Sequence, residues 1–216
     1  MIPSISCFPN AVALAALCGA LAWSSPVAFA ADRVIAHWDM SSPDASPRII
    51  PAGANSEAGD LKFPAASTAT IEKDSAVPGG QALVFPKVEP GGKSANKVAV
   101  AGDFSVELLV KVSPDNNSEK SLTIVFSPFF FLTYKNENIG FNVRLSDGYQ
   151  FLNKLIQPGK WIAVTARVEG GRMTLSVDGD SVEKSLPPDA KPNGEENLIS
   201  VGGVAGSIAK LVVTAK

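Results

Sequence analysis

The sequence is poor in the side chains on which thiol catalysts and many metal sites depend. It holds two cysteines, Cys7 and Cys18, and a single histidine, His37. Because both cysteines fall in the first thirty residues, the chain beyond them has no disulfide, no thiol nucleophile and no thiolate metal site. A domain without disulfides relies on its hydrophobic core, which fits a bacterial envelope protein better than a small disulfide-rich secreted module.

The sequence also has no large excess of positive or of negative charge. The 19 basic and 21 acidic residues give a formal net charge of −2, and both signs are interspersed without a basic run. Proteins that bind nucleic acid usually carry a basic patch, and polybasic segments attract anionic membranes. We expect neither nucleic acid nor an anionic membrane surface as a partner.

The N-terminal segment has no charged side chain before Asp32 and contains an apolar, alanine-rich run, Ala11–Trp23. The tripeptide Ala28-Phe29-Ala30 then supplies the small residues that a signal peptidase reads. We therefore expect residues 1–30 to be a signal peptide that is cut after Ala30. The protein would then be exported, to the periplasm or to the outside of the cell.

Two alternatives for this segment remain. An uncleaved membrane anchor is disfavoured because the thirteen residues of Ala11–Trp23 fall short of the roughly 20 that span a bilayer. Lipid attachment at Cys18 is disfavoured by the bulky Leu17 before it. After cleavage we expect no membrane span, and residues 31–216 have the length of one domain.

From Gln81 onward, apolar and polar residues alternate in runs of five to eight, separated by glycine, asparagine, aspartate and proline. This period predicts strands with one buried face. In Gly159–Gly179, two such runs flank Gly170-Gly171, as in a β-hairpin. No amphipathic helix of three turns is found. We predict an all-β fold, an antiparallel two-sheet jelly-roll sandwich, with a loop-rich N-terminal part at about 41–80.

The order of these motifs resembles that of the concanavalin A-like, laminin G-like jelly-roll domains. The resemblance covers most of Val34–Val213 and rests on the motifs VIAHWDM, GGQALVF, GDFSVELLVKV, GKWIAVTARVEGGRMTLSVDG, LISVGG and GSIAKLVV. It implies a single laminin G-like domain in residues 31–216. It says little about function, since this sandwich carries lectins, adhesion modules and glycan-active enzymes.

The resemblance also raises the question of calcium, which relatives often bind near an acidic residue that follows Gly-x-Ile in the last strand. Here Gly206-Ser207-Ile208 is followed by Ala209-Lys210, so the family-type site is not expected. Asp39, Asp44 and Asp178 carry oxygen atoms that could bind calcium, but Asp178 more simply shapes a turn. We expect no cofactor and do not favour a bound metal.

Strand alternation also predicts a binding face. In Gly159–Gly179 the apolar positions face the core, which leaves Trp161 and Arg167 outside, and the run around Phe141 turns out Asn142 and Arg144. An aromatic ring beside planar polar groups suits a sugar, whose C–H face stacks and whose hydroxyls hydrogen-bond. We predict a ligand site made of Trp161, Arg144, Arg167 and Asn142. The alternative is an ordinary solvated face on which a loop covers Trp161.

Catalytic residues are hard to find. Glycoside hydrolysis needs two carboxyl groups about 5–9 Å apart, and the best pair, Asp103 and Glu107, would be about 13 Å apart on one strand. His37 has no triad partners at a suitable spacing. We therefore expect no enzyme activity.

The resulting function hypotheses come from three classes. The first is an exported, non-catalytic module that binds carbohydrate or a surface glycoconjugate. The second is a structural or protein-interaction module of the cell envelope, and the third is an unusual glycan-active enzyme, either a glycosidase or a lyase. We expect Phe129-Phe130-Phe131 to pack in the core, and the alternative is an exposed contact with a membrane or a partner.

Overall fold

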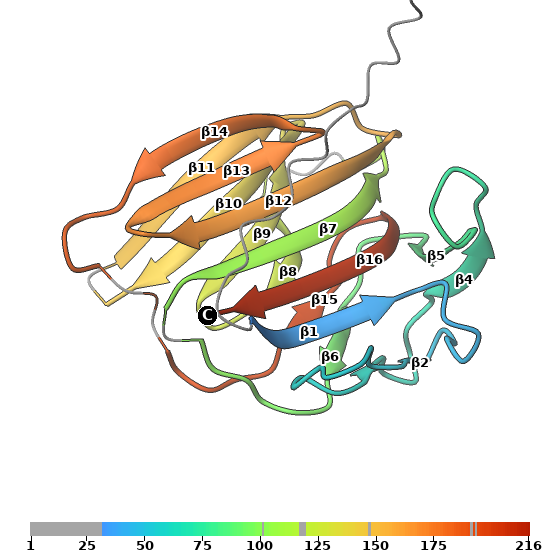
Figure 1. Cartoon of the computed structure of the whole chain (residues 1–216). Coiled ribbons are helices and arrows are strands. Elements are labelled where there is room, and N and C mark those ends of the chain that lie inside the picture. The colour runs from blue at the N-terminus through green and yellow to red at the C-terminus, as the bar shows by residue number, and fades with distance from the viewer. Residues whose placement is uncertain (1–31, 101, 117–119, 147, 191, 193) are drawn as a thin grey trace, which may run out of the picture.

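The computed structural model describes residues 32–216 except 101, 117–119, 147, 191 and 193. The predicted signal peptide, residues 1–30, lies outside this part. The described chain forms strands joined by turns and loops, without a helix, and two antiparallel sheets pack face to face (Figure 1). The predicted all-β, two-sheet jelly-roll sandwich is confirmed. None of the described residues belongs to a helix long and apolar enough to cross a membrane.

The sheet nearer the viewer in Figure 1, here the front sheet, has the strand order β14-β13-β12-β7-β16-β5-β4, and β1 pairs with β16. Its strands are β1 (Arg33–Asp39), β4 (Thr70–Lys73), β5 (Gln81–Phe85), β7 (Phe104–Val112), β12 (Trp161–Glu169), β13 (Arg172–Val177), β14 (Asp180–Ser185) and β16 (Gly206–Ala215). The hairpin predicted in Gly159–Gly179 is the β12–β13 pair, in which Val164 aligns with Val177.

The sheet behind it, here the back sheet, has the order β11-β10-β9-β8-β15-β6-β3-β2. Its strands are β2 (Ile49–Ile50), β3 (Leu61–Lys62), β6 (Gly92–Ser94), β8 (Leu122–Phe126), β9 (Phe130–Lys135), β10 (Asn138–Leu145), β11 (Gly148–Leu155) and β15 (Ser200–Val201). The four strands β8 to β11 follow one another in sequence and in space. They form a meander that ends at the edge strand β11.

The core lies between the sheets and follows from the alternation in each strand. On β12 the even-numbered side chains Ile162 to Val168 are buried, and on β10 the odd-numbered ones from Ile139 to Leu145 are buried. Phe129 and Phe130 are fully buried, with ring centroids 5.2 and 5.5 Å from that of Phe104. Core packing is therefore confirmed for two of the three consecutive phenylalanines.

The loop-rich segment at about 41–80 is tied to the sandwich by polar contacts. Trp38 is fully buried, and its Nε1 donates a hydrogen bond to the carbonyl oxygen of Gly59 at 2.9 Å. The buried Glu89 carboxylate accepts hydrogen bonds from the hydroxyls of Ser67 and Thr68, both at 2.7 Å. Burial by itself would raise the pKa of Glu89, but these hydrogen bonds and those from the Thr68 and Ala69 amides together hold it below its usual value.

Candidate functional site

The four residues predicted to form one binding face lie on two different faces. Trp161 and Arg167 belong to β12 in the front sheet, whereas Asn142 and Arg144 belong to β10 in the back sheet. Each side chain points away from the core, as the alternation predicted, but the two outer faces look in opposite directions. The prediction that these four residues share one face is wrong. The chain crosses to the other sheet after β11, so β10 is not a neighbour of β12.

Trp161 is held on the front sheet by the loop that joins β4 to β5. Its Nε1 donates to Asp74 Oδ2 at 2.9 Å, and Lys111 Nζ lies 2.9 Å from the same oxygen and 5.1 Å from the ring centroid. The ring also packs on a small apolar cluster that includes Val77 and Ala209. Hydrogen bonds from Lys111, the Ala76 amide and Trp161 lower the pKa of Asp74 to about 2.

This geometry gives Trp161 a structural role. Its N–H is bonded to a carboxylate, and a lysine and apolar side chains pack on the ring. The side chain stays half-buried and also lines a smaller hollow of about 340 Å³. These contacts favour the alternative in which a loop packs against Trp161.

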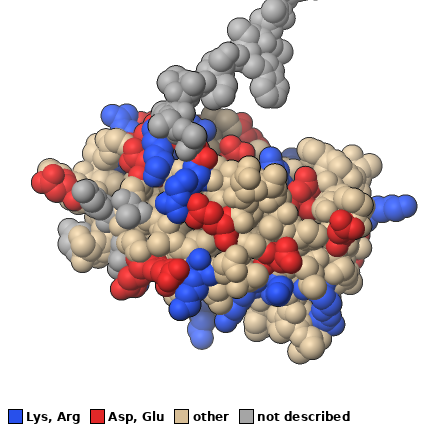
Figure 2. Space-filling model, turned by 60° about the horizontal axis from the view of Figure 1, so that its bottom comes forward, with Lys and Arg blue, Asp and Glu red and all other residues tan. Residues whose placement is uncertain are grey.

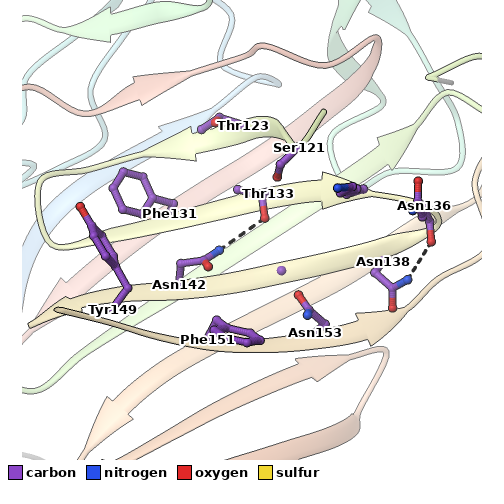
Figure 3. Close-up of a pocket in the computed structure, with 12 residues that line it drawn as sticks. Ser121, Thr123, Phe131, Thr133, Asn136, Asn138, Asn142, Tyr149, Phe151 and Asn153 are labelled. Atoms are coloured by element: carbon purple, nitrogen blue, oxygen red, sulfur yellow. Dashed lines mark hydrogen bonds between the residues drawn. The ribbon is translucent and has the colours of Figure 1, made fainter. Parts of the chain in front are cut away.

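The outer face of the back sheet carries a hollow of about 670 Å³ over β8 to β11 (Figure 3). Ligand sites typically have volumes of roughly 300–1,000 Å³. The lining combines aromatic rings, amides and hydroxyls, and its members are Ser121, Thr123, Phe131, Thr133, Lys135, Asn136, Asn138, Gly140, Asn142, Tyr149, Phe151 and Asn153. Of the predicted site residues, Asn142 lines this hollow. Arg144 lies two residues farther along the same face of β10.

Strand register arranges these side chains in rows across the sheet. Asn142 pairs with Phe131 of β9 on one side and with Phe151 of β11 on the other. One row along, Gly140 lies between Thr133 and Asn153. Because β9 and β11 lie on either side of β10, roughly 10 Å apart, their side chains form the walls of a groove. The floor is β10, and from Asn138 to Asn142 it is about 13 Å long.

Gly140 deepens this groove at its middle. A Cβ at that position would lie 2.5 Å from Thr133 Oγ1 and 2.9 Å from Asn153 Oδ1, and real Cβ atoms do not come so close to other heavy atoms. A glycine inside a strand often marks a place where another group approaches the backbone closely. The missing side chain leaves open the space between Thr133 and Asn153, while Asn142 Nδ2 donates to Thr133 Oγ1 at 3.4 Å.

The aromatic residues gather at the other end of the groove, as Figure 3 shows. The rings of Phe131 and Tyr149 are tilted by 42° with centroids 5.8 Å apart, and the Phe126 ring centroid is 5.0 Å from that of Phe131. Phe151 is 57% exposed, Tyr149 56% and Phe126 38%. Contiguous exposed apolar patches often mark a surface that binds a ligand or a partner.

The charges of the groove are few. None of the twelve lining residues is an aspartate or a glutamate. Arg144 Nη1 bonds to Glu195 Oε2 at 3.1 Å, and Lys184 Nζ lies 5.6 Å from the Phe151 ring centroid. Elsewhere, charges of both signs are interspersed over the face seen in Figure 2, with uncharged surface between them.

Two of the three acidic residues considered for calcium accept hydrogen bonds. Asp39 Oδ1 accepts from the amide and hydroxyl of Ser41, at 2.8 and 2.6 Å, and Asp178 Oδ1 accepts from the Ala163 amide at 2.8 Å. Asp178 has a φ of 50° and closes the turn after β13, as the sequence indicated. Across the described residues, no three side chains of histidine, cysteine, aspartate or glutamate gather as metal ligands would.

Sequence reasoning missed most of this site, in particular Phe131, Tyr149, Phe151 and Asn153. A signal was present in β11, where Tyr149, Phe151, Asn153 and Leu155 share one face. Both faces of that strand mix apolar and polar residues, so the pattern alone does not say which face is buried. Phe131 was hidden in a run of three phenylalanines, two of which are buried.

Comparisons with known proteins support the fold. No protein-family model matches the chain, and no curated protein matches its sequence. Domain 4 of an extracellular arabinanase from Geobacillus stearothermophilus, determined in complex with arabinotriose, is similar in structure with a TM-score of 0.61 and 14% identity, over 85% of this chain and 93% of that chain.

Two larger proteins contain a similar sandwich. A structure of botulinum neurotoxin type C, described as entering cells through two ganglioside molecules, has a TM-score of 0.57 at 10% identity, over 85% of this chain and 48% of that chain. Trypanosoma rangeli sialidase has a TM-score of 0.57 at 12% identity, over 84% of this chain and 30% of that chain. The chain thus spans less than half of these two proteins, and identities this low show a shared fold alone.

Proposed function

We propose that the protein is a non-catalytic carbohydrate-binding module and that its ligand lies along β10 in the back-sheet groove. The observation that carries the proposal is the composition of the groove. The exposed rings of Tyr149 and Phe151 and the half-buried ring of Phe131 lie beside the amides of Asn142 and Asn153. Aromatic faces stack on the C–H faces of sugar rings, and amides both donate to and accept from hydroxyls.

Two further observations support this function. The lining has no carboxylate, whereas glycoside hydrolysis by the common mechanisms needs a pair of them, so the groove suits binding better than cleavage. The similar arabinanase domain was determined with arabinotriose, and the similar toxin is described with gangliosides. Domains of this fold are therefore found with sugar ligands.

The length and openness of the groove favour a chain over a single sugar. Its floor is about 13 Å long and ends at Asn138 near the β9–β10 turn and at Asn142 near Arg144. Arg144 and Asn142 are thus the two sequence-predicted residues that we propose as ligand contacts. The exposed ring of Tyr149 would stack on the sugar at the aromatic end.

A glycan array probed with the full chain, followed by calorimetry with the best-bound oligosaccharide, tests the proposal. We expect binding to at least one class of oligosaccharide, weakened about tenfold, or 1.4 kcal/mol, by Tyr149→Ala. Absence of binding to every glycan would contradict it. Capture of one defined envelope protein by the same face would instead support the interaction-module hypothesis.

We further propose that the protein is exported and cut after Ala30. The proposal rests on the apolar run Ala11–Trp23 and the small residues at positions 28 and 30. Mass spectrometry of the protein isolated from its own cells should find an N-terminus at Ala31. A mature pool that begins at Met1 would contradict export by this route.

A further inference from the structure

We infer that the gap over Gly140 is a hydroxyl subsite that makes the groove select neutral sugars. This inference rests on the proposed function and adds the chemical class of the ligand. Thr133 and Asn153 would bind one sugar hydroxyl that points toward the sheet, and a carboxylate or sulfate in its place would be rejected.

The geometry of the gap suits one small polar group. Thr133 Oγ1 and Asn153 Oδ1 project toward each other from β9 and β11, and both lie within 3 Å of the place where a Gly140 Cβ would stand. A single hydroxyl group above Gly140 can therefore reach both oxygens, since O–H···O hydrogen bonds are about 2.5–3.0 Å long. Any side chain at position 140 would occupy this space.

The hydrogen-bonding roles in the gap are complementary to a hydroxyl. Thr133 Oγ1 accepts from Asn142 Nδ2, so its own proton is free to point toward a ligand oxygen. Asn153 Oδ1 can only accept. A sugar hydroxyl would accept from Thr133 Oγ1 and donate to Asn153 Oδ1 at once, so both of these oxygens would be hydrogen-bonded.

A carboxylate does not fit this arrangement. It has no proton to donate to Asn153 Oδ1. A carboxylate oxygen and Asn153 Oδ1 are both acceptors, so they would repel each other at this distance. Desolvating an unpaired charge is costly. Lys135 lies two residues beyond Thr133 on the same side of β9, and because its side chain is exposed, water weakens its attraction for an anion at the gap.

The first experiment compares matched ligands. β-gluco-, galacto- and arabino-oligosaccharides are printed on an array beside uronate-containing counterparts, and the full chain is applied at low and at high salt. We expect the neutral member of each bound pair to bind at least tenfold tighter, with affinity nearly unchanged by salt. Preference for the uronates, with affinity that falls as salt rises, would overturn the inference and leave carbohydrate binding intact.

The second experiment locates the hydroxyl. Thr133→Val keeps the side-chain shape and removes its hydrogen bond, and Thr165→Val makes the same change on the outer face of the front sheet. Each variant is titrated with the best-bound oligosaccharide and with a set of its singly deoxygenated analogues. For wild type and Thr165→Val, we expect one deoxy analogue to have about tenfold lower affinity than the parent sugar. For Thr133→Val, we expect that analogue and the parent sugar to have equal affinity.

The Gly140→Ala variant tests the subsite independently of Thr133. The added Cβ should abolish measurable binding while the melting temperature shows a folded protein. If no deoxy analogue couples to Thr133, and Gly140→Ala binds as wild type does, then Gly140 does not form a subsite. Carbohydrate binding as such would fail only if the array shows no bound glycan.

Discussion

The two outer faces of the sandwich follow the same strand alternation, but their aromatic side chains differ in how much other parts of the chain pack on them. On the front sheet, the outward-facing Trp161 is bonded to Asp74 and shares its surface with Lys111. On the back sheet, Phe151 and Tyr149 are more than half exposed beside amides. We infer that an outward-facing aromatic residue is available to a ligand only where no other part of the chain packs on it.

Loops decide which face stays open. The segment of residues 74–80 between β4 and β5 lies on the front face, where Val77 packs in the same cluster as Trp161. The lining of the back-face hollow comes from β8 to β11 and their immediate flanks. If this contrast is correct, changes on the front face should alter stability, and changes on the back face should alter binding.

The largest effect is expected for Trp161→Ala. The change removes a half-buried ring and leaves Asp74 without one of its donors, so the free energy of unfolding should fall by about 2–3 kcal/mol. Affinity for the oligosaccharide should stay within twofold of wild type. Urea denaturation and calorimetry on the same preparation check both quantities, and lost affinity with unchanged stability would reverse the assignment of the two faces.

Phe151→Ala should show the opposite behaviour. The ring is 57% exposed, so its loss should change stability by no more than about 0.5 kcal/mol. Affinity should drop about tenfold, or 1.4 kcal/mol, because a stacking surface is removed. Leu155→Ala is the matched control, since Leu155 is 68% exposed on the same face of β11 but outside the hollow. Equal losses of affinity in both variants would contradict a site centred on the groove.

A smaller effect, confined to acid, is expected for Asp74→Asn. The pKa of Asp74 is about 2 in the folded protein, below its ordinary value of 3.8, so its ionised form stabilises the fold above pH 3.8. That contribution is lost as the pH falls from about 5 to 2. Melting temperatures across this range should therefore fall less steeply in Asp74→Asn than in wild type, while other carboxylates with lowered pKa act equally in both. Parallel curves would show that the Asp74 contacts are weak.

The smallest effect is expected for Arg167→Ala, which alters an exposed side chain on the front face. Neither the melting temperature nor the affinity for the oligosaccharide should change measurably, since surface substitutions usually cost less than about 0.5 kcal/mol. A clear loss of affinity would restore the front face as a binding surface and weaken the contrast between the two faces.

Much of the fold could be predicted because it depends on local pattern. Alternation correctly assigned the buried side chains of β12 and β10, and glycine and aspartate correctly placed the turns around β13. What alternation does not encode is which strands become neighbours. The crossing after β11 sends β12 to the other sheet, and this separated Trp161 and Arg167 from Asn142 and Arg144.

The candidate site depended on contacts between distant parts of the chain. Trp161 meets Asp74 across 87 residues of sequence, so no local motif reports that its ring is covered. The sequence shows a glycine in the middle of β10. The role proposed for Gly140 depends on the strand register, which places Thr133 and Asn153 on either side of it. Register across three strands is a tertiary property that a sequence pattern does not supply.

The most direct test of the contrast between the faces is a titration of the isotopically labelled protein with its best-bound oligosaccharide, followed by amide NMR. The account predicts that the largest shifts fall on Thr133, Gly140, Asn142, Phe151 and Asn153, and that Trp161 and Arg167 do not move. Shifts concentrated around Trp161 on the front sheet, with the β9–β11 groove unchanged, would contradict it.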